Sequence, residues 1–153
     1  MIDFELHLDG NGWADAILTE ASKKHIYTAS WLHDGLREFL ECLCKLFSAR
    51  EAQCEWLQEP GLLRWTLERA DAQLLIRAEY PRNEAEGQNE HYKLYENNFS
   101  SQTDLLNFLE QVITAYSSVL EKWGAGRYED HRGWGYPFPF QELQKLTDLA
   151  ATL

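Results

Sequence analysis

The sequence has few of the features that stabilise secreted proteins or anchor membrane proteins. It contains three cysteines, Cys42, Cys44 and Cys54, an odd number without a C-x-x-C spacing. Cys42 and Cys44 point to different faces of a predicted helix, so we expect no disulfide framework and a reducing compartment. No apolar run approaches the ~18 residues of a membrane span, and residues 1–5 lack the regions of a signal peptide. We therefore predict a cytoplasmic location and no contact with a membrane.

Basic residues are also scarce. The chain has 14 Lys and Arg residues against 25 Asp and Glu residues, which gives a formal net charge of −11. A field of that sign repels phosphate backbones, and no stretch holds more than two adjacent basic residues, so we expect no nucleic-acid partner. The same charge would attract a basic protein partner. The alternative is that it only keeps the protein in solution.

Motifs of known chemistry are missing as well. The five histidines form no H-E-x-x-H or H-x-H spacing, and no G-x-S-x-G nucleophile motif occurs. The stretch from Gly124 to Gly126 follows a predicted helix, which indicates a helix C-cap instead of a phosphate-binding loop. We predict no cofactor, no metal and no catalytic residue. An acid–base or metal site formed by His7, His25 and His91 from different strands stays open as an alternative.

Alternating hydrophobic and polar residues are typical of antiparallel strands in this chain. In the first nine residues the side chains of Ile2, Phe4, Leu6 and Leu8 alternate with polar ones, which predicts a half-buried strand. Similar patterns predict strands near residues 13–18, 25–29, 53–56, 63–67, 74–80 and 91–99. Short turns such as 9–12 and 59–61 separate them. We therefore predict one antiparallel meander sheet of about six or seven strands.

Two longer segments carry the hydrophobic period of an amphipathic helix. The first covers residues 31–47 with Ser30 as N-cap, and the second covers residues 104–123 with Ser101 as cap. We expect both helices on one face of the sheet, followed by a short C-terminal helix at 141–149. At 153 residues the chain is close to the usual size of one domain. The predicted fold is therefore a single α+β domain over residues 1–153.

Two short stretches carry a resemblance to other proteins. Residues 28–36 read TASWLHDGL, and residues 59–65 read EPGLLRW. Together they resemble a group of small bacterial proteins that share a TAS-aromatic-L-x-D-x-L helix start and an EPG-x-x-RW hairpin. The resemblance extends in order of elements over most of residues 1–120. It implies no activity, substrate or catalytic residue for this chain.

The segment 127–140, RYEDHRGWGYPFPF, is unusually aromatic for a connection between helices. One interpretation is a strap that buries its rings over an open edge of the core. The other is a binding surface for a protein partner or a second copy, because aromatic and Arg side chains dominate binding energy. With the acidic loop near residues 84–90, it defines a candidate interaction surface. Its residues are Arg127, Tyr128, Arg132, Trp134, Tyr136, Phe138, Glu84, Glu86 and Glu90.

These features favour a non-enzymatic protein-binding domain of an immunity-like or regulatory kind. In this hypothesis an acidic surface masks a basic partner by charge complementarity. An alternative is a small-molecule-binding protein or enzyme, with a pocket between sheet and helices near His91, Tyr95 and the 127–136 loop. A homodimer formed through an edge strand or the aromatic segment is a third alternative.

Overall fold

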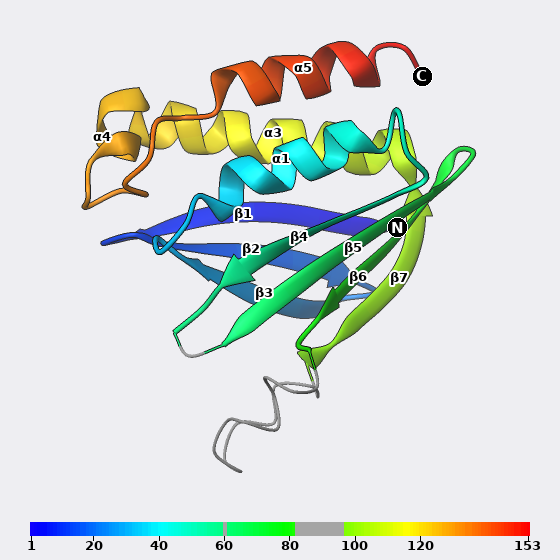
Figure 1. The fold of residues 1–153 in the computed structure, drawn as a ribbon, viewed down its shortest axis with the longest axis horizontal. Coiled ribbons are helices and arrows are strands. Elements are labelled where there is room, and N and C mark those ends of the chain that lie inside the picture. The colour runs from blue at the N-terminus through cyan, green and yellow to red at the C-terminus, as the bar shows by residue number, and fades with distance from the viewer. Residues whose placement is uncertain (60, 82–96) are drawn as a thin grey trace.

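The computed structural model describes residues 1–59, 61–81 and 97–153. Within these ranges the chain forms seven strands and four helices, which confirms the α+β class (Figure 1). The strands divide into a three-stranded and a four-stranded sheet, both antiparallel. No helix in the described ranges is long and apolar enough to cross a membrane.

The N-terminal sheet has the order β1-β2-β3. It consists of β1 (Ile2–Gly10), β2 (Trp13–Glu20) and β3 (Lys23–Ser30). Buried and exposed residues alternate strictly along the first eight positions of β1, as its sequence pattern predicts. The turn between β2 and β3 lies at Ala21 and Ser22, which both have positive φ, so β3 begins at Lys23, two residues before the strand predicted at 25–29.

The C-terminal sheet has the order β4-β5-β6-β7. It consists of β4 (Glu51–Leu57), β5 (Leu62–Ala70), β6 (Gln73–Glu79) and β7 (Phe99–Asp104). The EPG hairpin joins β4 to β5, where the Gln58 N–H donates to the Gly61 carbonyl at 2.9 Å. Most of the strand predicted at 91–99 lies outside the described residues, and the described strand β7 begins at Phe99.

The prediction of a single meander sheet is wrong, because the chain changes sheets between β3 and β4. Side chains, and not a backbone ladder, connect the two sheets in the described residues. The Gln58 Nε2–H donates to the Thr28 carbonyl at 2.7 Å, and the Tyr27 hydroxyl donates to the Asn97 carbonyl at 2.5 Å. A helix separates β3 from β4, so no hairpin forces them to pair. Hydrophobic periodicity determines which face of a strand is buried, but not which strand lies beside it.

The helices form two layers above the strands (Figure 1). They are α1 (Gly35–Lys45), α3 (Leu105–Trp123), α4 (Ala125–Glu129) and α5 (Phe140–Ala150). Helix α1 packs on β4, α3 packs on β1, and α5 packs on both α1 and α3. Only α3, with 19 residues, is long, whereas α1 has 11 residues and is shorter than the predicted 31–47.

The N-caps differ from those expected, because both predicted serines belong to strands. Ser30 ends β3 and Ser101 lies within β7, so the actual N-caps are Asp34 and Asp104. Each carboxylate accepts the backbone N–H three residues later, at 3.3 Å from Arg37 and 2.8 Å from Asn107. Strand pairing therefore continues past the predicted capping residue, and each helix begins after a later one.

Phe39 of α1 occupies the centre of the core, where the two sheets and the helix layer meet. Its fully buried ring lies 5.8 Å from Phe4 of β1, 5.8 Å from Trp56 of β4 and 5.1 Å from Trp65 of β5. Tyr27 of β3 also contacts Trp65, at 5.5 Å between ring centroids. This aromatic cluster joins the two sheets without hydrogen bonds between their backbones.

We expect Phe39→Ala to lower the free energy of unfolding by about 3–5 kcal/mol, because it opens a cavity between both sheets. The measurement is urea denaturation followed by tryptophan fluorescence. Ile26→Ala, at a side chain that is 55% exposed, is the matched control and should change stability by about 0.5 kcal/mol or less. Equal effects of the two substitutions would contradict the central position of Phe39.

Candidate functional site at the start of helix α1

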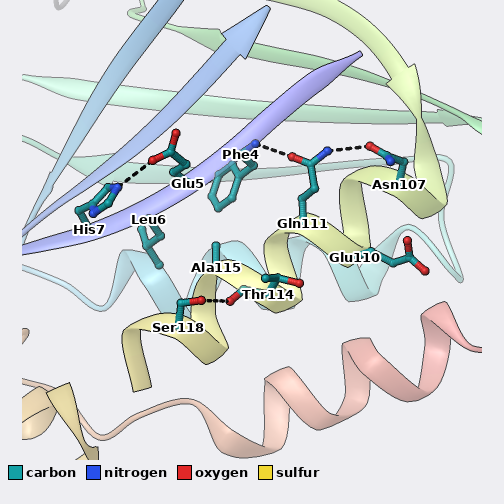
Figure 2. A pocket seen from close by; sticks show the side chains of 10 residues that line it. All are labelled: Phe4, Glu5, Leu6, His7, Asn107, Glu110, Gln111, Thr114, Ala115 and Ser118. Atoms are coloured by element: carbon teal, nitrogen blue, oxygen red, sulfur yellow. Dashed lines mark hydrogen bonds and ion pairs between the residues drawn. The ribbon is translucent and has the colours of Figure 1, made fainter. Parts of the chain in front are cut away.

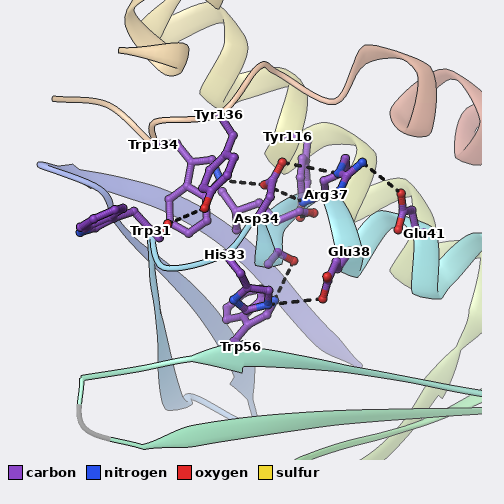
Figure 3. Close-up of polar contacts among 12 residues, drawn as sticks. Trp31, His33, Asp34, Arg37, Glu38, Glu41, Trp56, Tyr116, Trp134 and Tyr136 are labelled. Carbon is purple, nitrogen blue, oxygen red and sulfur yellow. Dashed lines mark hydrogen bonds and ion pairs between the residues drawn. The ribbon is translucent and has the colours of Figure 1, made fainter. Parts of the chain in front are cut away.

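The two sequence stretches that stand out most lie against each other at the start of α1 (Figure 3). The indole Nε1–H of Trp134 donates to Oδ1 of Asp34 at 2.9 Å, although the two residues are 100 positions apart. The Tyr136 hydroxyl donates to the carbonyl of Trp31 at 2.7 Å. The aromatic segment is therefore attached directly to the TASWLHDGL stretch.

Asp34 is the buried polar group at the centre of this contact. Its carboxylate accepts hydrogen bonds from Trp134 and from the Arg37 backbone, and the Arg37 guanidinium lies 3.6 Å from its second oxygen. Burial raises the pKa of Asp34, although the bonds from Trp134 and Arg37 act in the opposite direction. The protein thus keeps a nearly buried acid to hold the aromatic segment and the helix start together.

His33 and Gly35 fasten the same turn to strand β4. The His33 Nε2–H donates to the Glu55 carbonyl at 2.7 Å, and the Glu38 carboxylate lies 3.3 Å from the same nitrogen. The Trp56 indole donates to the Gly35 carbonyl at 2.9 Å. A Cβ at Gly35 would lie 2.7 Å from the Trp56 ring, so only glycine allows this approach. Nε2 of His33 and the Gly35 carbonyl therefore have structural partners.

The structure separates the residues of the aromatic segment into buried and exposed groups. Tyr128 and Trp134 are fully buried and Phe138 is 6% exposed, so these rings form the strap that was one of the two interpretations. Arg127 and Arg132 are exposed, and the Arg127 guanidinium lies 4.9 Å from the centre of the Trp123 ring.

Tyr136 is partly exposed and remains at the surface. The other predicted positions, Glu84, Glu86, Glu90, His91 and Tyr95, lie outside the described residues. Of the strand histidines, His7 pairs with Glu5 and His25 packs against Phe99.

Backbone hydrogen bonds hold the strap in place. The N–H groups of Asn11 and Gly12, in the β1–β2 turn, donate to the carbonyls of Arg132 and Gly133, each at 2.9 Å. A Cβ at Gly133 would lie 2.1 Å from the Arg127 carbonyl oxygen, so the close approach of the strap to α4 requires glycine. The surface that the strap presents is therefore rigid.

Sequence reasoning missed two exposed hydrophobic residues beside this strap, Trp31 and Leu32, and did not single out Phe140 at the end of the strap. The exposed fractions are 52% for Trp31, 45% for Leu32 and 52% for Phe140. They are half of the six large hydrophobic residues that are exposed in the described part of the chain. Leu32 was expected on the buried face of a helix over 31–47, but it is exposed because α1 begins only at Gly35. The signal available was a Trp-Leu pair that ends two residues before Asp34, a good N-cap.

We call the surface at the start of α1 the α1-start patch. A depression of about 660 Å³ lies here, and its lining includes Leu32, Tyr136, Pro137 and Phe140. The α1-start patch consists of these four residues. Trp31 borders it through its carbonyl, which accepts from Tyr136, whereas the Trp31 side chain packs on Gly12 and points away from the depression (Figure 3). The lining of the depression also includes the acidic residues Asp34, Glu38 and Glu142 and the cation Arg37, while Lys145 lies in the neighbouring depression beside Phe140 and Glu142. The arrangement is an apolar surface with an acidic rim.

We expect Asp34→Ala to destabilise the protein by about 1–3 kcal/mol, because it removes an N-cap and leaves the buried Trp134 N–H without an acceptor. Asp34→Asn keeps an acceptor oxygen and should cost less. The control Asp104→Ala removes an exposed N-cap and should cost about 1 kcal/mol. Urea denaturation at neutral pH measures all three variants.

The stability difference between Asp34→Asn and the unsubstituted protein should also depend on pH. The pKa of Asp34 is raised in the folded state, so the protonated acid favours folding and this contribution is lost as the pH rises through the folded-state pKa. The stability of Asp34→Asn relative to the unsubstituted protein should therefore increase from about pH 3 to about pH 7. A difference that stays constant or decreases would show that the Asp34 carboxylate is not penalised by burial.

Comparison with other proteins adds no relative. No known protein family, no curated protein and no solved structure matches this chain. Within the described ranges, no group of three His, Cys, Asp or Glu side chains is placed to hold a metal ion. The physical properties of the α1-start patch therefore carry the functional proposal.

Proposed function

We propose that this chain is a non-enzymatic protein-binding domain that docks a basic partner on the α1-start patch. The observation that carries the proposal is the gathering of Leu32 and Phe140, each about half exposed, with Tyr136 in one depression beside the strap. Contiguous exposed apolar surface is uncommon on monomeric proteins and often marks an interaction site. Aromatic side chains at such a surface supply much of the binding energy.

Rigidity of the α1-start patch supports the proposal. Tyr136 is held by its hydrogen bond to Trp31, and Trp134 beneath it is fixed on Asp34. Backbone bonds from the β1–β2 turn hold the strap from the other side. A surface that is already ordered loses little conformational entropy when a partner binds, so more of the contact energy remains as affinity.

Charge favours a basic partner. Glu38 and Glu142 line the depression at the patch, and the formal net charge of the whole chain is −11. An acidic rim speeds the encounter with a basic surface and disfavours acidic competitors, and both effects decrease with salt. This chemistry suits an immunity-like or regulatory protein that covers a basic surface of its partner.

A cytoplasmic location is part of the same proposal. All three cysteines are free thiols, and Cys42 and Cys44 are buried in the core. Free thiols are typical of a reducing compartment. The exposed Arg127 and Arg132, which belong to the 127–140 segment, are proposed to lie at the margin of the contact.

The test is affinity capture from the native host with the unsubstituted protein and two variants. We expect the double substitution Leu32→Ser with Phe140→Ser to reduce recovery of a stoichiometric basic partner by about tenfold or more, because two exposed apolar contacts are lost. Ile26→Ser is the matched control, since Ile26 is 55% exposed on β3 away from the patch. Its recovery should equal that of the unsubstituted protein.

Thermal denaturation of each variant confirms that the fold is intact. Binding of the recovered partner should also weaken as salt increases. A partner that the double variant retains in full, or one with an acidic surface and no salt dependence, would refute the proposal. Recovery of no stoichiometric protein would refute it equally.

A further inference from the structure

Among the described residues, strand β1 has an edge without a neighbouring strand, which a side chain closes only in part (Figure 2). The strand pairs with β2 on one side and lies at the end of its sheet. On the other side, the Phe4 N–H donates to Oε1 of Gln111 at 2.6 Å, and Nε2–H of Gln111 donates to the Ile2 carbonyl at 2.9 Å. Asn107 accepts a second bond from Nε2 at 2.7 Å. The Gln111 amide thus takes the place of one peptide group of a neighbouring strand.

The next peptide groups along this edge have no such substitute. Backbone groups of a strand face alternate sides with a period of two, so Leu6 faces the same side as Phe4. No side chain or loop of the described residues bonds to the backbone of Leu6 on that side. The pairing of β1 with β2 shifts register between Leu8 and Gly10, which ends the regular edge. The available edge therefore extends from Phe4 to Leu8.

A groove of about 400 Å³ runs between this edge and helix α3. The α3 side chains that line it become smaller along the helix. Asn107 and Gln111 fill the first part, whereas Thr114, Ala115 and Ser118 line the part beside Leu6 (Figure 2). The hydroxyl of Ser118 is turned to the Thr114 carbonyl of its own helix at 2.8 Å. Small side chains thus leave space where the edge lacks a partner.

A second copy of the chain does not fit this edge. Pairing β1 with β1 of another copy would place the two strands about 4.8 Å apart. Each β1 carries its own α3, which reaches the outer edge through Gln111. Packed helices need about 8–10 Å between their axes, so the two α3 helices would collide. An extended segment without an attached helix avoids this collision.

We propose that the β1 edge between Phe4 and Leu8 binds an extended basic segment of a partner protein, which adds to the N-terminal sheet as a fourth strand. Residues of the segment that face Leu6 and Ala115 are small and apolar. Alternate residues lie on the outer face beside Glu5, which is 48% exposed and has His7 as its neighbour at 3.1 Å. Glu110, exposed on α3, borders the other side of the groove.

The sequence that fits therefore alternates apolar and basic residues, since successive side chains of a strand point to opposite faces. Main-chain hydrogen bonds to Leu6 provide the binding, and the two glutamates select positive charge. This proposal is independent of the α1-start patch, because the two surfaces share no residue.

The test is a nuclear magnetic resonance titration of the isotope-labelled full chain with the blocked hexapeptide acetyl-Lys-Val-Lys-Val-Lys-Val-amide. We expect the Leu6 amide signal to shift and its hydrogen exchange to slow. The peptide acetyl-Glu-Val-Glu-Val-Glu-Val-amide should bind about tenfold more weakly or worse. A lysine–valine peptide methylated at alternate backbone nitrogens, which lacks the donors of one edge, should also bind weakly.

Thr114→Trp fills the groove from an exposed position and should abolish the shift at Leu6. Ser117→Trp, on the exposed face of α3 but outside the groove, is the matched control and should leave the shift unchanged. No change at Leu6 with millimolar peptide, or equal binding by Thr114→Trp, overturns the proposal. Light scattering that shows a dimer with the Leu6 amide already protected overturns it as well.

Discussion

The hydrogen bond between the Trp134 indole and the Asp34 carboxylate is the contact on which the exposed surface of this protein depends. It joins the start of α1 to a strap 100 residues later in the chain, and both partners are almost fully buried. A buried charge is costly unless several donors satisfy it. Here the Arg37 backbone and guanidinium supply further partners, so one acid caps a helix and holds the strap.

Single residues also make several contacts where the two sheets meet. No backbone ladder joins β3 to β4 in the described residues, so side chains and rings connect the sheets. Tyr27 contributes both a ring contact to Trp65 and a hydroxyl bond to Asn97. Phe39 packs on rings from both sheets. The high aromatic content therefore serves mainly the core, and only a few large rings remain for the surface.

Two surfaces stay outside this packing, and they differ in kind. The α1-start patch is an apolar surface ordered by the hydrogen bonds of Trp134 and Tyr136, which suits the side chains of a folded partner. The β1 edge instead offers main-chain groups beside a groove, which suits an extended segment. Both are bordered by acidic side chains, Glu38 and Glu142 at the patch and Glu5 and Glu110 at the edge. The acidic composition thus gives both proposed surfaces the same preference for positive charge.

Local physical rules determined most of the strands and the longest helix of this fold from the sequence alone. The alternation along β1 and the helical period of 105–123 are consequences of which face of each element is buried, and the structure follows both. The aromatic segment also stood out by composition, and Tyr136 belongs to the proposed surface. These features depend on neighbours within a few positions, so they can be recognised without the fold.

Only the tertiary structure decided what those elements contact. The division into two sheets, the shift of the N-cap from Ser30 to Asp34 and the exposure of Leu32 follow from long-range pairing that overrides local preference. The contact of Trp134 with Asp34 likewise required the chain to close a loop of 100 residues. Hydrophobic periodicity indicates which side chains of an element are buried. The residues that bury them come from a distant segment, which periodicity does not identify.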